Sequence, residues 1–202
     1  MATTDQARRK YKISDDVFIE ASRTKRGFFL EDETQFVAFD KDFDHPFTDD
    51  WLAAIDAAEA EPTDEMLDDQ SSQLTAAVEA QMVLCRGKFQ DAKYFIEKAF
   101  PANQPVWNEF GYNNYEKARR TQSLMIPFMK KFHGVCVKYG TQMNTAGYTD
   151  EAIAAILTLA TALETANNTQ EIFIGNMPVQ TQTRINTYNT AWDILVIVCS
   201  AG

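Results

Sequence analysis

The sequence is poor in the side chains that most enzymes use for chemistry. Its 202 residues include only two histidines, His45 and His133, and eight scattered glycines. Neither histidine has a glutamate three residues before it, which excludes the Glu-x-x-His pairs of a ferritin-like di-metal centre. The histidines form no Ser-His-Asp or Cys-His arrangement, and the glycines form no phosphate-binding loop. We therefore expect a non-enzymatic protein without a cofactor.

Cysteine is also scarce, with Cys85, Cys136 and Cys199 far apart in the chain. An odd number without Cys-x-x-Cys spacing excludes a zinc site and a disulfide framework. Each cysteine has apolar neighbours, so we expect three small buried hydrophobic side chains. His133, three residues before Cys136, is the one neighbour that could activate a thiol, but no third partner is recognisable.

No apolar run approaches the length of a membrane-spanning helix. The longest, Ile194 to Cys199, has six residues, whereas a span needs about 20. The first residues have no apolar segment behind them, so no secretory signal is predicted. These features favour the cytoplasm, and export without a cleavable signal stays open.

The charge is concentrated in one stretch. Acids outnumber bases by 29 to 19, giving a net charge of −10, and residues 31–69 hold fifteen acids and one base. Apolar side chains recur there at helical spacing, which predicts a helical hairpin with an acidic solvent face. Residues 1–30 and 70–140 are net basic, so they are the expected counter-surface, in the same chain or a second copy. The acidic balance argues against nucleic-acid binding.

The apolar spacing predicts an all-α chain. A polar, basic arm over 1–14 precedes a first helix over 15–39, loosened at Gly27. The further helices that we expect are 49–60, 64–100, 115–139 with a kink at Pro127, one opening near Tyr148 and ending at Asn167–Thr169, and a last one, disturbed by Gly175 and Pro178, that resumes over 180–199. The β-rich run Ile194–Val198 leaves a strand open as an alternative.

Two segments half the chain apart match each other. Residues 47–55 and 148–156 each have an aromatic residue, a Thr cap, two acids and an apolar stripe. Tyr11 falls on Tyr112 at the same offset. The match predicts an internal duplication. We expect one domain over 15–202, a bundle of about six helices built from two pseudo-twofold-related three-helix units, with repeat unit 15–100, linker 101–114 and repeat unit 115–202.

Four short motifs carry a resemblance to other proteins. They are Arg8–Asp15, Pro62–Glu65, Glu109–Tyr112 and the Thr-Asp-Glu cap at 149–151. With this layout the chain resembles an uncharacterised family of bacterial all-helical proteins of about this length. The resemblance implies a helical, duplicated fold and carries over no activity, cofactor or catalytic residue.

Three groups of residues are candidates for binding. Asp40, Asp42 and Asp44 occupy positions 1, 3 and 5 of an EF-hand-like loop, although positions 6 and 12 lack the required Gly and Glu. They predict either a weak calcium site or a solvated helix end. Four aromatic residues in the linker or directly after it, called here the linker aromatics, could line a pocket or fill the space between the halves: Trp107, Phe110, Tyr112 and Tyr115. Ten basic residues could form a stripe for nucleic acid or for acidic protein: Arg86, Lys88, Lys93, Lys98, Lys117, Arg119, Arg120, Lys130, Lys131 and Lys138.

These features favour a structural or interaction protein that self-associates. We expect a homo-oligomer formed through charge-complementary helices and the termini, either a subunit of a larger assembly or a filament. The alternative is a helical module that binds a small ligand or calcium.

Overall fold

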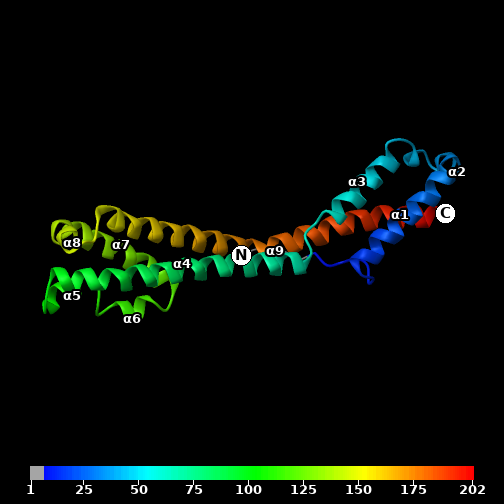
Figure 1. Cartoon of the computed structure of the whole chain (residues 1–202). Helices are drawn as coiled ribbons and strands as arrows, with labels where there is room; N and C mark the ends of the chain where they lie inside the picture. The colour runs from blue at the N-terminus through cyan, green and yellow to red at the C-terminus, as the bar shows by residue number, and fades with distance from the viewer. Residues whose placement is uncertain (1–6) are drawn as a thin grey trace, which may run out of the picture. The chain divides into compact units, whose positions relative to one another are not determined.

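The computed structural model describes residues 7–202, and every regular element in that range is helical. The all-α prediction is therefore confirmed (Figure 1). Nine α-helices and one 3-10 helix occur in these residues, where about six helices were expected. They are α1 (Asp15–Glu31), α2 (Glu33–Phe39), η1 (Lys41–Phe43), α3 (Phe47–Glu59), α4 (Asp64–Ala99), α5 (Gln104–Glu109), α6 (Tyr115–Ala118), α7 (Gln122–Lys138), α8 (Gly140–Ala146) and α9 (Asp150–Ala201).

The chain forms two compact units, and one of them combines the two ends of the sequence. Unit 1 comprises 1–67 and 176–202, and unit 2 comprises 68–175. Helices α4 and α9 each contribute to both units. The units therefore do not coincide with the expected repeat units 15–100 and 115–202.

Unit 1 packs α1, α2, η1 and α3 around the last part of α9. Its core is strongly aromatic, with Tyr11 stacked on Phe18 at 4.8 Å between ring centroids, and Phe29 lying 4.5 Å from Phe36. Trp51 is fully buried among these rings. Such ring pairs supply much of the apolar burial in a unit of this size.

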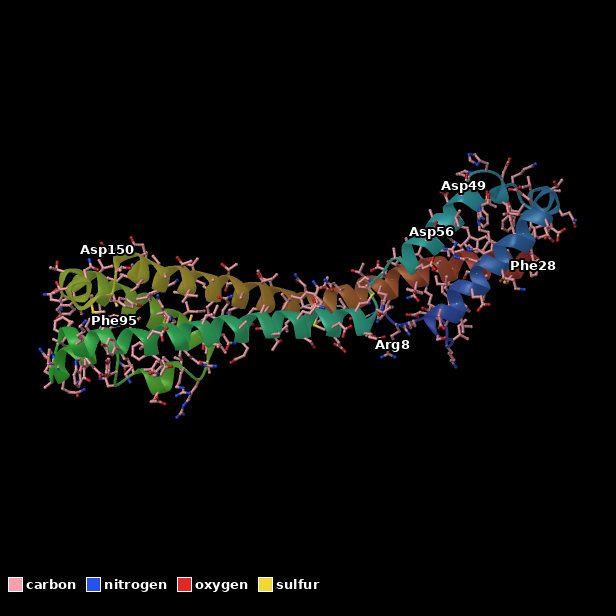
Figure 2. All side chains as sticks on the ribbon, in the orientation of Figure 1. Arg8, Phe28, Asp49, Asp56, Phe95 and Asp150 are labelled. Atoms are coloured by element: carbon pink, nitrogen blue, oxygen red, sulfur yellow. The ribbon has the colours of Figure 1, made fainter. Side chains whose placement is uncertain are left out.

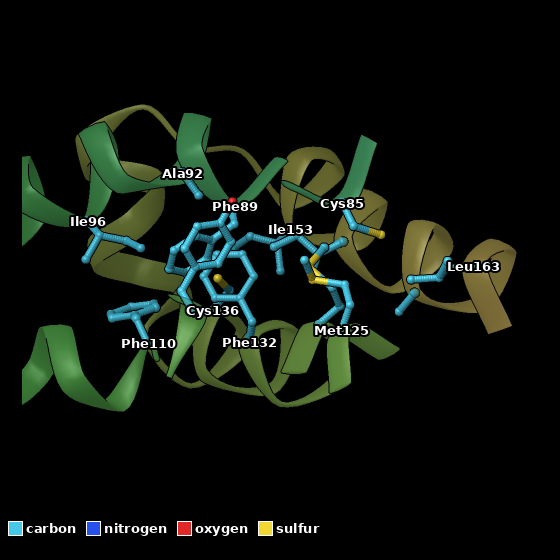
Figure 3. Close-up of a cluster of buried hydrophobic side chains, with 14 of the residues drawn as sticks. Cys85, Phe89, Ala92, Ile96, Phe110, Met125, Phe132, Cys136, Ile153 and Leu163 are labelled. Atoms are coloured by element: carbon cyan, nitrogen blue, oxygen red, sulfur yellow. The ribbon is translucent and has the colours of Figure 1, made fainter. Parts of the chain in front are cut away.

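Unit 2 packs α4 against the first part of α9, with α5 to α8 covering them. Cys85 and Thr75 of α4 contact Leu159 and Gln170 of α9, respectively, so the two helices run antiparallel. The core centres on Phe89, which stacks on Tyr115 at 4.4 Å and meets Phe132 edge-on (Figure 3). Unit 2 thus has its own hydrophobic core.

The first predicted helix is divided at a different residue from the one expected. The helix ends at Glu31 and restarts at Glu33, whereas Gly27 lies inside α1, with open space where a Cβ would lie. The backbone leaves the helical conformation at Asp32, with φ −108° and ψ 10°, and Phe29 contacts Phe36 across the break.

The prediction that the fifth helix ends at Asn167–Thr169 is wrong. Helix α9 is continuous from Asp150 to Ala201 and passes through Gly175 and Pro178. Gln170 is buried and donates from Nε2 to Thr75 Oγ1 at 2.8 Å, which ties this part of the helix to α4. The run Ile194–Val198 is helical, with Leu195 and Val198 buried one turn apart, so the strand alternative is wrong.

The region 101–139 is also divided differently from the prediction. The predicted linker 101–114 contains α5, and the helix predicted over 115–139 breaks at 119–121 between α6 and α7. Pro127 lies inside α7, which continues through it.

The described part of the N-terminal arm is held by its own chain. Asn189 accepts from the Lys10 N–H at 2.9 Å and donates to the Arg8 carbonyl at 2.9 Å, while Lys10 Nζ pairs with Asp193 at 2.6 Å. Residues 1–6 of the predicted arm lie outside the described residues. Contacts within the chain therefore hold residues 8–10. The expected role of the termini in an oligomer stays a prediction.

Candidate functional site

The aspartates of the predicted calcium site lie around η1 and are all exposed. The Asp40 carboxylate accepts the Asp42 backbone N–H at 3.0 Å, and the Asp44 carboxylate accepts the His45 N–H at 2.8 Å. In the described range 7–202, no group of three or more His, Cys, Asp or Glu residues is arranged to hold a metal ion. The structure therefore does not bring Asp40, Asp42 and Asp44 together as ligands.

Most acids of the stretch 31–69 have no ion-pair partner among residues 7–202. Arg23 pairs with Asp56 at 2.8 Å and with Glu59, and Arg184 pairs with Asp64 at 2.6 Å. His45 Nδ1 lies 3.5 Å from Asp49. Figure 2 shows Asp49 and Asp56 on α3. Eleven acids of this stretch remain without an ion-pair partner in the described chain.

The two units differ in charge. Unit 1 holds nine bases and eighteen acids, whereas unit 2 holds ten bases and eleven acids. Three ion pairs with N–O distances of 2.6 to 2.7 Å join bases and acids of unit 2 to each other: Arg86–Glu79, Lys130–Glu164 and Lys138–Glu109. The excess of negative charge thus resides in unit 1.

The thiols divide into two kinds. Cys85 and Cys136 are fully buried, and desolvation raises their pKa from 9.0 to about 11 and about 12. Such thiols stay protonated and unreactive. Cys199 is exposed, which corrects the expectation that all three are buried.

The linker aromatics are held by packing and hydrogen bonds. Trp107 Nε1 donates to the Phe100 carbonyl at 3.0 Å, and the Tyr112 hydroxyl lies 3.3 Å from the Lys93 carbonyl and 3.2 Å from Glu97. Burial raises the pKa of Tyr112. Three of the four therefore fill unit 2 without lining the pocket that Phe110, Phe128 and Phe132 line, and Phe110 does both.

One pocket of about 270 Å³ lies between the turn after α5, α6 and α7. Its walls are largely apolar, with Phe110 and Phe132 buried and with Leu124, Pro127 and Phe128 beside them. Lys117 and Lys131 also line it, and both are exposed. The pocket therefore combines an apolar interior with two cations at its solvent side.

Gly111 shapes one wall of this pocket. Its φ is +97°, and a Cβ there would lie 2.6 Å from Phe128 Cε2. The absent side chain lets the Phe128 ring lie directly on the turn. The sequence held one signal for this wall, since Leu124, Phe128 and Lys131 follow a helical i, i+4, i+7 spacing. The approach of the Gly111 turn is a long-range contact that no local pattern predicts.

A second, wider hollow lies in unit 2 along α4 and α9. It is lined by small side chains, among them Ala77, Ala154 and Ala162, and also by Leu157 and by His133 of α7. No charged side chain lines it. His133 therefore belongs to a shallow apolar groove and lies in no cluster that suggests catalysis.

Comparisons with protein-family models, with curated proteins and with solved structures return no match. The resemblance to a bacterial all-helical family stays a prediction. No helix in the described part of the chain combines the length and apolarity that a membrane span requires.

Proposed function

We propose that this protein is a non-enzymatic structural protein that self-associates through oppositely charged surfaces of two copies. The observation that carries the proposal is the set of eleven acids in 31–69 without ion-pair partners in residues 7–202. Exposed charges of one sign repel each other within a surface and attract a surface of opposite sign.

Unit 2 supplies cations for such a contact. Lys98 and Arg120 are exposed, and neither has an ion pair within the described chain. A contact between unit 1 of one copy and unit 2 of another uses two different surfaces. Such a heterologous contact gives a ring if its rotation closes and a filament if it does not.

Exposed apolar side chains in unit 1 favour the same conclusion. Phe39 of α2, inside the acidic stretch, is 73% exposed, and Phe28 of α1, just before it, is 55% exposed (Figure 2 labels Phe28). Aromatic side chains supply much of the binding energy where a contact excludes water. Charge would therefore steer two copies together, and the phenylalanines would add affinity.

Charge reversal at three exposed acids tests the proposal. Asp42, Asp50 and Glu65 are exposed and lack ion pairs within the described residues. We expect the triple variant Asp42→Lys/Asp50→Lys/Glu65→Lys to weaken self-association at low salt by at least about tenfold in the association constant. Sedimentation velocity over a concentration series measures this.

The matched control keeps the charge and changes the side chains. The variant Asp42→Glu/Asp50→Glu/Glu65→Asp should associate as the wild type does, because the charges stay in place. Circular dichroism checks that both variants stay helical. Equal association of the charge-reversed variant and the wild type would contradict the proposal.

We further propose that the chain arose by duplication and that its halves exchange their last helices. Three observations support this. In α1–α3 and again in α7–α9, a long helix is followed by a short helical segment and then by another helix. Each compact unit also combines the early segments of one half of the sequence with the last helix of the other half. Ile55 and Ile156, equivalent in the sequence match, are both fully buried. Superposition of the two units in an experimental structure tests it, and a better fit in another register would contradict it.

A further inference from the structure

We infer that the pocket of unit 2 between the Gly111 turn and α7 binds a small amphipathic anion, a carboxylate with an apolar body. The site is separate from the acidic stretch on which the proposed self-association rests, because all its lining residues lie within 109–132.

The inner part of the pocket suits an apolar group. Phe110 and Phe132 are each 1% exposed and belong to the core of unit 2, and the Phe128 ring packs against Phe89 at 5.1 Å (Figure 3 shows Phe110 and Phe132). Burying an apolar group against such walls is favourable by roughly 25 cal/mol per Å². The volume of about 270 Å³ lies near the lower end of ligand pockets, so the ligand is small.

The mouth of the pocket suits an anion. Lys117 of α6 and Lys131 of α7 both line it, and neither ammonium has a hydrogen bond or ion pair with any described residue. Both side chains are exposed while the phenylalanines are buried, which orients a ligand with its charge toward solvent. A charge-assisted hydrogen bond to a carboxylate is about twice as strong as a neutral one.

Glu109 is the one carboxylate in the lining of the pocket, and it does not oppose the binding of an anion. Glu109 pairs with Lys138 Nζ at 2.6 Å and accepts from the Tyr139 hydroxyl at 3.1 Å. These two contacts hold the pKa of Glu109 below its usual range, and its charge is compensated outside the pocket. The uncompensated charges of the lining are therefore the two lysines.

Octanoate, with octanol as its uncharged counterpart, tests the site in the full chain by isothermal titration or ligand-observed NMR. We expect octanoate to bind saturably with one site per chain and octanol to bind at least about tenfold more weakly. Lys117→Gln/Lys131→Gln should weaken octanoate binding by at least about tenfold and leave octanol binding unchanged. Lys130→Gln is the matched control, since Lys130 is the neighbour of Lys131 but pairs with Glu164, and it should bind octanoate as the wild type does.

A space-filling variant locates the ligand. Leu124 lines the pocket at an exposed position, 37% exposed, so Leu124→Trp should fill the pocket without disturbing the core and should abolish octanoate binding. The inference is overturned if folded wild type shows no saturable octanoate binding at millimolar concentration. It is equally overturned if the double lysine variant binds octanoate as well as the wild type, if octanol binds as tightly as octanoate, or if helical Leu124→Trp still binds.

These outcomes are separate from those of the self-association experiment. Lys130→Gln and Leu124→Trp leave the acids of 31–69 unchanged, so the state of association of each variant is measured alongside binding at the same salt. Binding that fails while association persists overturns the ligand site alone.

Discussion

At the scale of single residues, glycine conformation shapes the candidate pocket. Gly111 has a φ in the left-handed region that favours glycine, and Phe128 occupies the space a side chain would need. Gly134 lies inside α7 and has no neighbour within 4 Å of a Cβ built there. Replacement by alanine should therefore change the free energy of unfolding in opposite directions at these two glycines.

We expect Gly111→Ala to lower the free energy of unfolding by about 1–3 kcal/mol, because the backbone is strained and Phe128 must move. Gly134→Ala should raise it by about 0.5–1 kcal/mol, since alanine favours a helix. Urea unfolding followed by circular dichroism measures both. A Gly111→Ala variant as stable as the wild type would contradict the geometry of this turn.

The buried thiols give a prediction of reactivity at the same scale. At pH 8 a thiol reagent such as Ellman's reagent should modify Cys199 in the native chain within minutes, and Cys85 and Cys136 only after unfolding. Rapid modification of all three in the native protein would show that the core of unit 2 opens easily.

The same burial makes stability depend on pH. The pKa of both thiols is higher in the folded chain than the ordinary value of 9.0. The neutral thiols therefore contribute fully below pH 9, and their contribution is lost as the pH rises toward about 11 to 12. Cys85→Ala/Cys136→Ala, compared with the wild type in urea across pH 8 to 11, should show a shallower loss of stability above pH 9. An equal slope would contradict this source of pH dependence.

At the scale of elements, most helix starts and ends follow from local sequence, and the exceptions involve contacts between distant segments. The starts at Asp15 and Asp64 were predicted correctly, because acids in a first turn and a preceding Ser or Thr are local signals. Past Asn168, α9 continues and is tied to α4 by the hydrogen bond of Gln170 to Thr75, 95 residues away. No window of sequence contains that contact.

The same limit applies to the candidate site. Phe110 and the lysines were recognisable as candidate residues, but their meeting with Phe128 depends on the turn at Gly111 and on the break at 119–121. The aspartates at 40–44 matched a loop pattern over only three positions, and they do not converge on a metal site.

Pro178 allows a test of the continuity of α9. It is exposed, lies in the helix interior and lacks the N–H that would bond the carbonyl of Ile174. Pro178→Ala should raise the free energy of unfolding by roughly 1–3 kcal/mol and increase helicity. Asn168 is exposed on the same helix. Asn168→Ala should change the free energy of unfolding by only a few tenths of the change expected for Pro178→Ala. Destabilisation by Pro178→Ala in urea unfolding would contradict a helix continuous through this position.

At the scale of the whole molecule, charge is distributed between the units and is not balanced within each. Unit 1 is net −9 and unit 2 is net −1, and the acids of 31–69 are largely unpaired in the described chain. The sequence predicted this stretch correctly as acidic helical structure, because composition and periodicity are local. The surface that the acidic stretch faces could not be predicted from composition alone.

The mass of the wild-type chain in solution, measured by light scattering as salt is raised, tests self-association through charge most directly. Salt screens exposed charges over about 10 Å at 0.1 M and over about 3 Å at 1 M. At low salt we expect species well above the 22.9 kDa chain that shift toward the monomer as salt rises. A monodisperse monomer at every salt concentration, at protein concentrations up to the millimolar range, would contradict the proposed function.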